Sequence, residues 1–80
     1  MPLVTLYTRA GCCLCDQAKQ VLAAARAHAA FDLEEVDIDR RTEFLPLYND
    51  DVPVIAIDGH KAFEHGVDMQ TFLKRLAACA

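Results

Sequence analysis

The sequence lacks the features that mark nucleic-acid-binding, membrane-spanning and exported proteins. It has no run of Lys or Arg, and its formal net charge is −4. We therefore expect neither a nucleic acid nor an anionic membrane as a partner. No apolar stretch approaches the ~20 residues that a membrane-spanning helix needs. Residues 1–6 contain neither a basic segment nor a small-residue cleavage site, so we expect no signal or transit peptide and a cytoplasmic location.

Internal repeats, low-complexity segments and linkers are also absent from the sequence. Hydrophobic residues make up 54% of the chain, a share that favours a packed core over disorder. A length of 80 residues suits one small domain, and we take residues 1–80 as that single domain. Nothing in the sequence demands an oligomer, so a monomer is expected.

The four cysteines are not distributed as in a disulfide scaffold. Cys12, Cys13 and Cys15 are crowded together, whereas Cys79 stands alone near the end. Such crowded thiols cannot join distant loops, and structural disulfides are rare in a reducing compartment. A cluster of this kind is more often catalytic or metal-binding.

The first part of the chain predicts a strand followed by a helix. Residues 3–8 are a near-continuous apolar run, which is typical of a central strand covered on both faces. From 13 to 28 the pattern is helical. Its apolar stripe consists of Leu14, Ala18, Val21, Leu22, Ala25 and Ala29.

The middle of the chain predicts a second strand and a short helix. Residues 33–38 form the strand, and the acidic Glu34 and Glu35 suit a sheet edge. Residues 40–48 form the helix, in which Pro46 implies either a kink or a helix that is mostly first turn. The side chains that this helix is expected to bury are Phe44, Leu45 and Tyr48.

The last part predicts a hairpin and a final helix. Residues 54–57 and about 61–64 form two antiparallel strands, joined by the turn signal Asp58-Gly59. Asp68 is a good N-cap. The helix that it opens has its apolar residues at helical spacing, namely Met69, Phe72, Leu73 and Leu76. The whole order is β-α-β-α-β-β-α, which predicts an α/β fold with a four-stranded mixed sheet, helices on both faces, and the first two strands parallel.

The motif with chemistry lies where the first strand ends and the first helix begins. Cys12 and Cys15 have C-x-x-C spacing on a first helical turn, so their thiols can close a small disulfide ring. The helix N-terminus favours the thiolate of Cys12, so Cys12 should attack and the deeper Cys15 should resolve. Arg9 would favour the thiolate further, while Asp16 would oppose it, and the sequence does not decide between them.

This arrangement resembles the thioredoxin superfamily over the whole chain. The resemblance rests on a strand, then C-x-x-C opening a helix, then Val52-Pro53 starting a later strand. The segment 6–12 looks like glutaredoxins, and Cys-Leu-Cys-Asp at 13–16 looks like the glutaredoxin-like family with a C-x-L-C-D motif. The resemblance implies a thioredoxin-like fold and a thiol–disulfide oxidoreductase.

The resemblance also implies the roles of several residues. Cys12 would be the nucleophile and Cys15 the resolving thiol. Pro53 would be a cis-proline facing the active site, and the backbone of Val52 would pair with the substrate. In glutathione recognition, two residues would meet the ends of the tripeptide. They are Arg9, which would meet the glycine carboxylate, and Asp68, which would meet the γ-glutamyl end.

Two departures from glutaredoxins bear on glutathione. Cys13-Leu14 replaces the usual Pro-Tyr between the cysteines, and His65-Gly66 replaces the usual Gly-Gly before the last helix. A side chain at position 65 would crowd the glutathione backbone. We expect no bound cofactor, with glutathione as a possible co-substrate. The expected partners are a disulfide-containing protein or glutathione substrate, and a reductant that is either glutathione or an enzyme of the thioredoxin-reductase type.

Two other functions remain open on the sequence alone. Three clustered thiols suit a soft metal or an iron–sulfur cluster. A structural zinc site needs four ligands, however, and no second C-x-x-C or nearby His pair supplies the remainder, so no metal ligands are assigned. A redox-silent binding domain is the third possibility, and the two thiols at the helix start argue against it.

Overall fold

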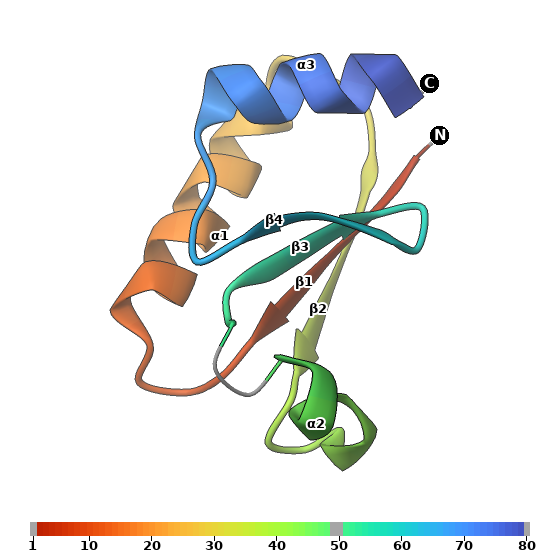
Figure 1. Ribbon diagram of the computed structural model, residues 1–80. Coiled ribbons are helices and arrows are strands. Elements are labelled where there is room, and N and C mark those ends of the chain that lie inside the picture. The colour runs from red at the N-terminus through yellow and green to blue at the C-terminus, as the bar shows by residue number, and fades with distance from the viewer. Residues whose placement is uncertain (1, 49–50, 80) are drawn as a thin grey trace.

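Strands and helices alternate in the order that the sequence predicts. The computed structural model describes residues 2–48 and 51–79. Its elements are β1 (Leu3–Thr8), α1 (Cys13–Ala25), β2 (Asp32–Asp37), a 3-10 helix (Thr42–Phe44), α2 (Leu45–Tyr48), β3 (Val54–Ile57), β4 (His60–Glu64) and α3 (Met69–Cys79). The predicted order β-α-β-α-β-β-α is confirmed, as are the boundaries of β1 and β3 (Figure 1).

The sheet is mixed, with strand order β2-β1-β3-β4. β1 pairs in parallel with β2, as a crossover through α1 requires, and antiparallel with β3. β3 and β4 form the predicted hairpin, whose turn residues Asp58 and Gly59 have φ of 51° and 85°. The acidic β2 lies at a sheet edge, as predicted, and the apolar β1 and β3 lie inside.

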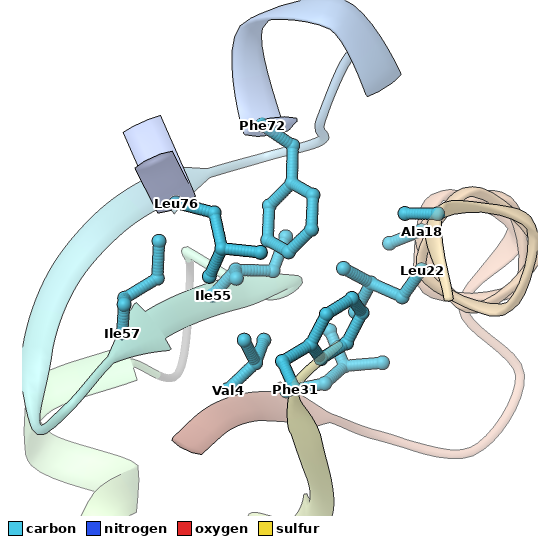
Figure 2. Close-up of a cluster of buried hydrophobic side chains, with 10 residues drawn as sticks. Val4, Ala18, Leu22, Phe31, Ile55, Ile57, Phe72 and Leu76 are labelled. Atoms are coloured by element: carbon cyan, nitrogen blue, oxygen red, sulfur yellow. The ribbon is translucent and has the colours of Figure 1, made fainter. Parts of the chain in front are cut away.

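The main core lies between the sheet and the helices α1 and α3. Figure 2 shows side chains from all of these elements converging there, with Phe31 from the segment before β2. The Phe31 and Phe72 rings meet edge to face, 5.5 Å between centroids. The labelled members of the cluster are Val4, Ala18, Leu22, Phe31, Ile55, Ile57, Phe72 and Leu76.

The opposite face of the sheet is covered by the short helical segment. Successive residues of a strand point to opposite faces, so Tyr7 points away from the core side of Leu6. The Tyr7 ring lies 4.9 Å from Phe44 and 4.6 Å from Tyr48, measured between centroids. Helices therefore cover both faces, as predicted. Pro46 stands in the first turn of α2, where its missing N–H costs no helical bond.

Several local predictions need correction. α1 ends at Ala25 and not at 28, because the next residues form a tight turn that brings the buried Phe31 into the core. Leu14 is 47% exposed, since the buried row of α1 runs through Cys15, which leaves Leu14 at its margin. The side chains that the predicted helix 40–48 was expected to bury are only half-buried, because the 3-10 helix and α2 cover one end of the sheet alone; they are Phe44, Leu45 and Tyr48.

The helix predicted over 40–48 begins only at Thr42, as the 3-10 helix Thr42–Phe44 followed by α2, and the other differences are shifts of one residue at strand ends. β2 begins at Asp32 and ends at Asp37, one residue earlier than predicted, because its register is set by parallel pairing with Leu3–Thr8. β4 begins at His60, which pairs with Ile57 directly after the turn. None of the helices in residues 2–48 and 51–79 has the length and apolar character needed to cross a membrane.

Candidate active site

The loop between β1 and α1 sets up the two cysteines. Gly11 has φ +78°, a left-handed conformation that glycine adopts without strain. Cys12 follows in an extended conformation, φ −95° and ψ 112°, as the N-cap of α1. Its carbonyl accepts the first helical hydrogen bond, from the N–H of Asp16 at 3.2 Å. Cys12 thus stands where the unpaired N–H groups of the helix gather.

The structure brings Cys12 and Cys15 together. The backbone N–H of Cys15 donates a hydrogen bond to Cys12 Sγ at 3.2 Å, so a thiol takes the place of the usual oxygen N-cap. Cys12 is half-buried, whereas Cys15 is only 1% exposed. Cys13 is exposed, and all three thiols are free. An incoming molecule therefore meets Cys12 before Cys15. The side chain of Cys79 lies outside the described residues.

The two thiols differ in their surroundings. Burial raises the pKa of the Cys15 thiol above its ordinary value, and a hydrogen bond with Cys12 raises it further. The Thr8 hydroxyl and the backbone of Arg9 act in the opposite direction, because both can donate hydrogen bonds to a Cys15 thiolate. Cys15 is thus held mainly as a neutral thiol beneath Cys12.

Arg9 makes a contact that the sequence analysis did not anticipate. Its guanidinium engages both oxygens of Asp39, with Nη2–Oδ1 at 2.7 Å and Nε–Oδ2 at 3.3 Å. This two-point contact lowers the pKa of the Asp39 carboxyl. Asp39 follows β2, and no motif marked it in advance, since its importance depends on β2 pairing beside β1.

A polar cavity of about 340 Å³ opens next to this loop. Lys19 of α1 and Glu35 of β2 form an ion pair of 2.9 Å at its side, which raises the pKa of Lys19. Charges of both signs surround the cavity. The lining residues are Thr8, Arg9, Ala10, Gly11, Asp16, Lys19, Glu35 and Asp37.

Pro53 lies at the same end of the sheet as the loop that carries Cys12. Val54 pairs with Tyr7, so the residue before it falls beside Thr8, the last residue of β1. The Val52–Pro53 peptide bond is cis, and Pro53 is buried while Val52 is half-buried. The Pro53 carbonyl accepts a hydrogen bond of 2.9 Å from the N–H of His65.

His65 and Asp68 flank the approach to α3. His65 has φ +67°, a left-handed conformation in which a side chain is uncommon and which glycine adopts freely. Asp68 is confirmed as the N-cap of α3, because its Oδ2 accepts hydrogen bonds from the N–H and the hydroxyl of Thr71 at 3.1 and 3.2 Å.

Among the described residues, the clustered cysteines do not form a group of converging metal ligands. The one group whose ligand atoms all lie within 4.8 Å of one another is Asp51, Glu64 and His65. Glu64 and His65 are exposed, and Glu64 is engaged with Lys61 at 3.3 Å. Exposed acidic groups of this kind are common without an ion. The metal-binding interpretation is therefore not favoured.

Comparison with known proteins agrees with this geometry. The profile of the glutaredoxin-like domain family (DUF836) matches residues 3–77. The chain belongs to the glutaredoxin-like family of the thioredoxin superfamily. A glutaredoxin-like protein of Dictyostelium discoideum is 34% identical over 71 residues, which cover 81% of this chain and 66% of that protein. The chain thus spans slightly less than two thirds of the length of this curated relative.

Solved structures share the fold of this chain. A structural genomics target from X. campestris is 36% identical, with a TM-score of 0.76 and coverage of 94% of this chain and 96% of that one. A mutant thioredoxin from Halobacterium salinarum is 13% identical, with a TM-score of 0.74 over 96% of this chain and 73% of that one, and this likeness shows the fold alone. Membership of the glutaredoxin-like family suggests a thiol redox role.

Proposed function

We propose that this protein is a thiol–disulfide oxidoreductase that works through Cys12 and Cys15. Cys12 attacks a disulfide of the substrate and forms a mixed disulfide. Cys15 then attacks Cys12 Sγ, which closes the Cys12–Cys15 disulfide and releases the substrate as a thiol. The substrate is a protein disulfide or a glutathione mixed disulfide.

The observation that carries the proposal is the hydrogen bond from the Cys15 N–H to Cys12 Sγ at 3.2 Å. This bond holds the Cys12 sulfur at the first turn of α1, directly beside the cysteine that would resolve the mixed disulfide. The half-exposed position of Cys12 and the 1% exposure of Cys15 support the order of the two roles. The buried thiol has direct access to Cys12 and little access to solvent.

Substrate contacts are proposed at four residues. The backbone of Val52 would pair with the backbone of an incoming peptide, while Pro53, whose carbonyl already accepts from the N–H of His65, would face the substrate through its ring. Arg9 would bind a carboxylate of the substrate. That carboxylate must replace the Asp39 carboxylate, which contacts the Arg9 guanidinium at two points. Asp68 would meet an amino group, while its Oδ2 already caps α3.

Glutathione is proposed as a co-substrate and not as a resident cofactor. The exposed side chain of His65 stands where glutaredoxins have glycine, so a protein disulfide has easier access than a glutathione backbone in that place. Oxidised enzyme would be returned to the dithiol by glutathione or by an enzyme of the thioredoxin-reductase type. A cytoplasmic, reducing setting is part of this proposal.

The test is a redox titration with three single variants. Purified protein is equilibrated in glutathione redox buffers, and the oxidised form is mapped by mass spectrometry. We expect a reversible Cys12–Cys15 disulfide in the wild type, no turnover for Cys12→Ser, and a trapped mixed disulfide for Cys15→Ser. Cys13→Ser is the matched control, because Cys13 is an exposed neighbour in the same turn, and it should keep turnover.

Three results would contradict the proposal. Full dithiol turnover in both Cys12→Ser and Cys15→Ser would remove the two thiols from the chemistry. A wild-type protein that shows no reversible oxidation would exclude a dithiol enzyme. A glutathione adduct on Cys12 without an internal disulfide would replace the dithiol mechanism with a monothiol one.

A further inference from the structure

Thr8 carries a buried hydroxyl that stands out among the polar groups of the molecule. The residue is 4% exposed, and its Oγ1 has no hydrogen-bond partner within the described part of the chain. Buried hydroxyls are nearly always hydrogen-bonded, so an unpaired one requires an explanation. The backbone carbonyl of Thr8 is hydrogen-bonded, because it accepts from the N–H of Ile38 at 2.9 Å.

The fold directs Thr8 and Cys15 into the same interface. Leu6 belongs to the core beneath α1, and Thr8, two residues later in β1, points to the same face of the sheet. Cys15 belongs to the buried row of α1 that faces the sheet, together with Ala18 and Leu22. The Thr8 hydroxyl acts to lower the pKa of the Cys15 thiol, as a donor to the thiolate would.

We propose that Thr8 is the hydrogen-bond donor that stabilises the Cys15 thiolate in the resolving step. This inference rests on the proposed function. In the resting dithiol, Cys15 is a neutral thiol and Thr8 Oγ1 lacks a partner. When Cys15 loses its proton, the hydroxyl donates to the new charge, so the fold holds the donor ready at the buried sulfur. The Thr8 hydroxyl therefore has a hydrogen-bond partner when Cys15 is a thiolate, and it lacks one when Cys15 is a neutral thiol.

The step balances without an added reductant. Cys15 gives its thiol proton to water, and its sulfur anion attacks Cys12 Sγ of the mixed disulfide. The Cys12–Cys15 bond forms, the bond from Cys12 to the substrate sulfur breaks, and the departing thiolate takes up a proton from water. The two protein thiols are oxidised and the substrate disulfide is reduced by the same two electrons.

Solvent reaches the vicinity of Thr8 through the polar cavity of about 340 Å³, which Thr8 helps to line. The charged groups that face Cys15 and this cavity come from three elements. Cys12 and Arg9 lie in the loop before α1, Asp16 and Lys19 lie on α1, and Glu35 and Asp37 lie on β2. The positive charge of Lys19 acts together with Thr8 in favour of a Cys15 anion, whereas the carboxylates oppose it.

The test separates the two steps in one stopped-flow trace. The reduced protein carries Cys13→Ser and Cys79→Ser and is mixed with one equivalent of dithionitrobenzoate at several pH values. The first coloured thiolate reports the attack by Cys12, and the second reports the attack by Cys15. The variants are Thr8→Val, which removes the hydroxyl at nearly constant volume, and Thr8→Ser, which keeps it.

We expect the second phase of Thr8→Val to be about tenfold slower or more at neutral pH, as the loss of a hydrogen bond to a charged group implies. Its pH midpoint should rise by about one unit or more. The first phase should keep its wild-type rate, and Thr8→Ser should keep both phases. If Thr8→Val does not fold, Thr8→Ala against Thr8→Ser repeats the comparison, because that pair differs only in the hydroxyl.

An unchanged pH profile of the second phase in the variants without the hydroxyl would overturn the role of Thr8. A second phase in Thr8→Ser that is as slow as the second phase in Thr8→Val would overturn it as well. A failure of the proposed function gives a different result. In that case the parent protein shows no second phase, or the second phase persists in Cys15→Ser.

Discussion

Replacing Leu22 by alanine tests whether α1 packs on the sheet as described. Leu22 is 0% exposed and belongs to the core between α1, the sheet and α3. The substitution removes three carbon atoms from this core, worth roughly 2.4 kcal/mol at about 0.8 kcal/mol for each. Incomplete collapse around the cavity adds to this, so we expect the free energy of unfolding to fall by about 3–4 kcal/mol.

The chain offers the same substitution at an exposed site as a control. Leu47 is 61% exposed, so Leu47→Ala should change the free energy of unfolding by less than about 0.5 kcal/mol. Urea unfolding of the reduced proteins, followed by circular dichroism, gives both values from the midpoints at an unchanged slope. Equal losses for Leu22→Ala and Leu47→Ala would refute the assignment of the core to this face.

Two further predictions concern the cap of α3 and the buried thiol. Asp68→Ala should lower the free energy of unfolding by about 1 kcal/mol, because the N-cap bonds of α3 are lost. Asp68→Asn should retain most of the wild-type stability, because the amide oxygen can still accept. Equal urea midpoints for the wild type and both variants would contradict this role. Burial raises the pKa of Cys15 above its ordinary value of 9.0, so the folded protein holds this proton more tightly than the unfolded chain. The resulting stability is complete below about pH 9 and is lost as the pH rises through the folded-state pKa. The urea midpoint of reduced wild type should therefore fall toward that of Cys15→Ala between pH 8 and 11, and a constant difference would show that Cys15 does not contribute in this way.

Local patterns in the sequence were sufficient for the order of the strands and helices, whereas the pairing of Cys12 with Cys15 as reactive thiols stays a prediction. The continuous apolar run at Leu3–Thr8 and the turn Asp58-Gly59 depend on short-range chemistry, so their strands were predicted correctly. The C-x-x-C spacing alone required Cys12 and Cys15 to share one helical turn. The acidic residues of β2 indicated a sheet edge, because charges are tolerated where one side of a strand faces solvent.

The predictions that were wrong concern features set by packing between segments that are distant in the sequence. α1 stops at Ala25 because the chain must return Phe31 to the core, and the alanine-rich sequence gives no local stop signal there. Leu14 follows the helical spacing of apolar residues, but α1 packs on the sheet through the row of side chains that includes Cys15. Leu14 lies at the margin of that row and stays exposed.

Residues close together in the chain were enough to predict the order of elements, the edge strand and the placement of two cysteines at the start of α1, since each depends on neighbours within a few residues. Three contacts depend on the tertiary fold: Arg9 pairs with Asp39, Pro53 lies beside Thr8, and the Thr8 hydroxyl is buried near Cys15. These contacts join residues that are separate in the chain and adjacent only after the strands have paired. Their energies depend on burial and distance, neither of which a local pattern contains.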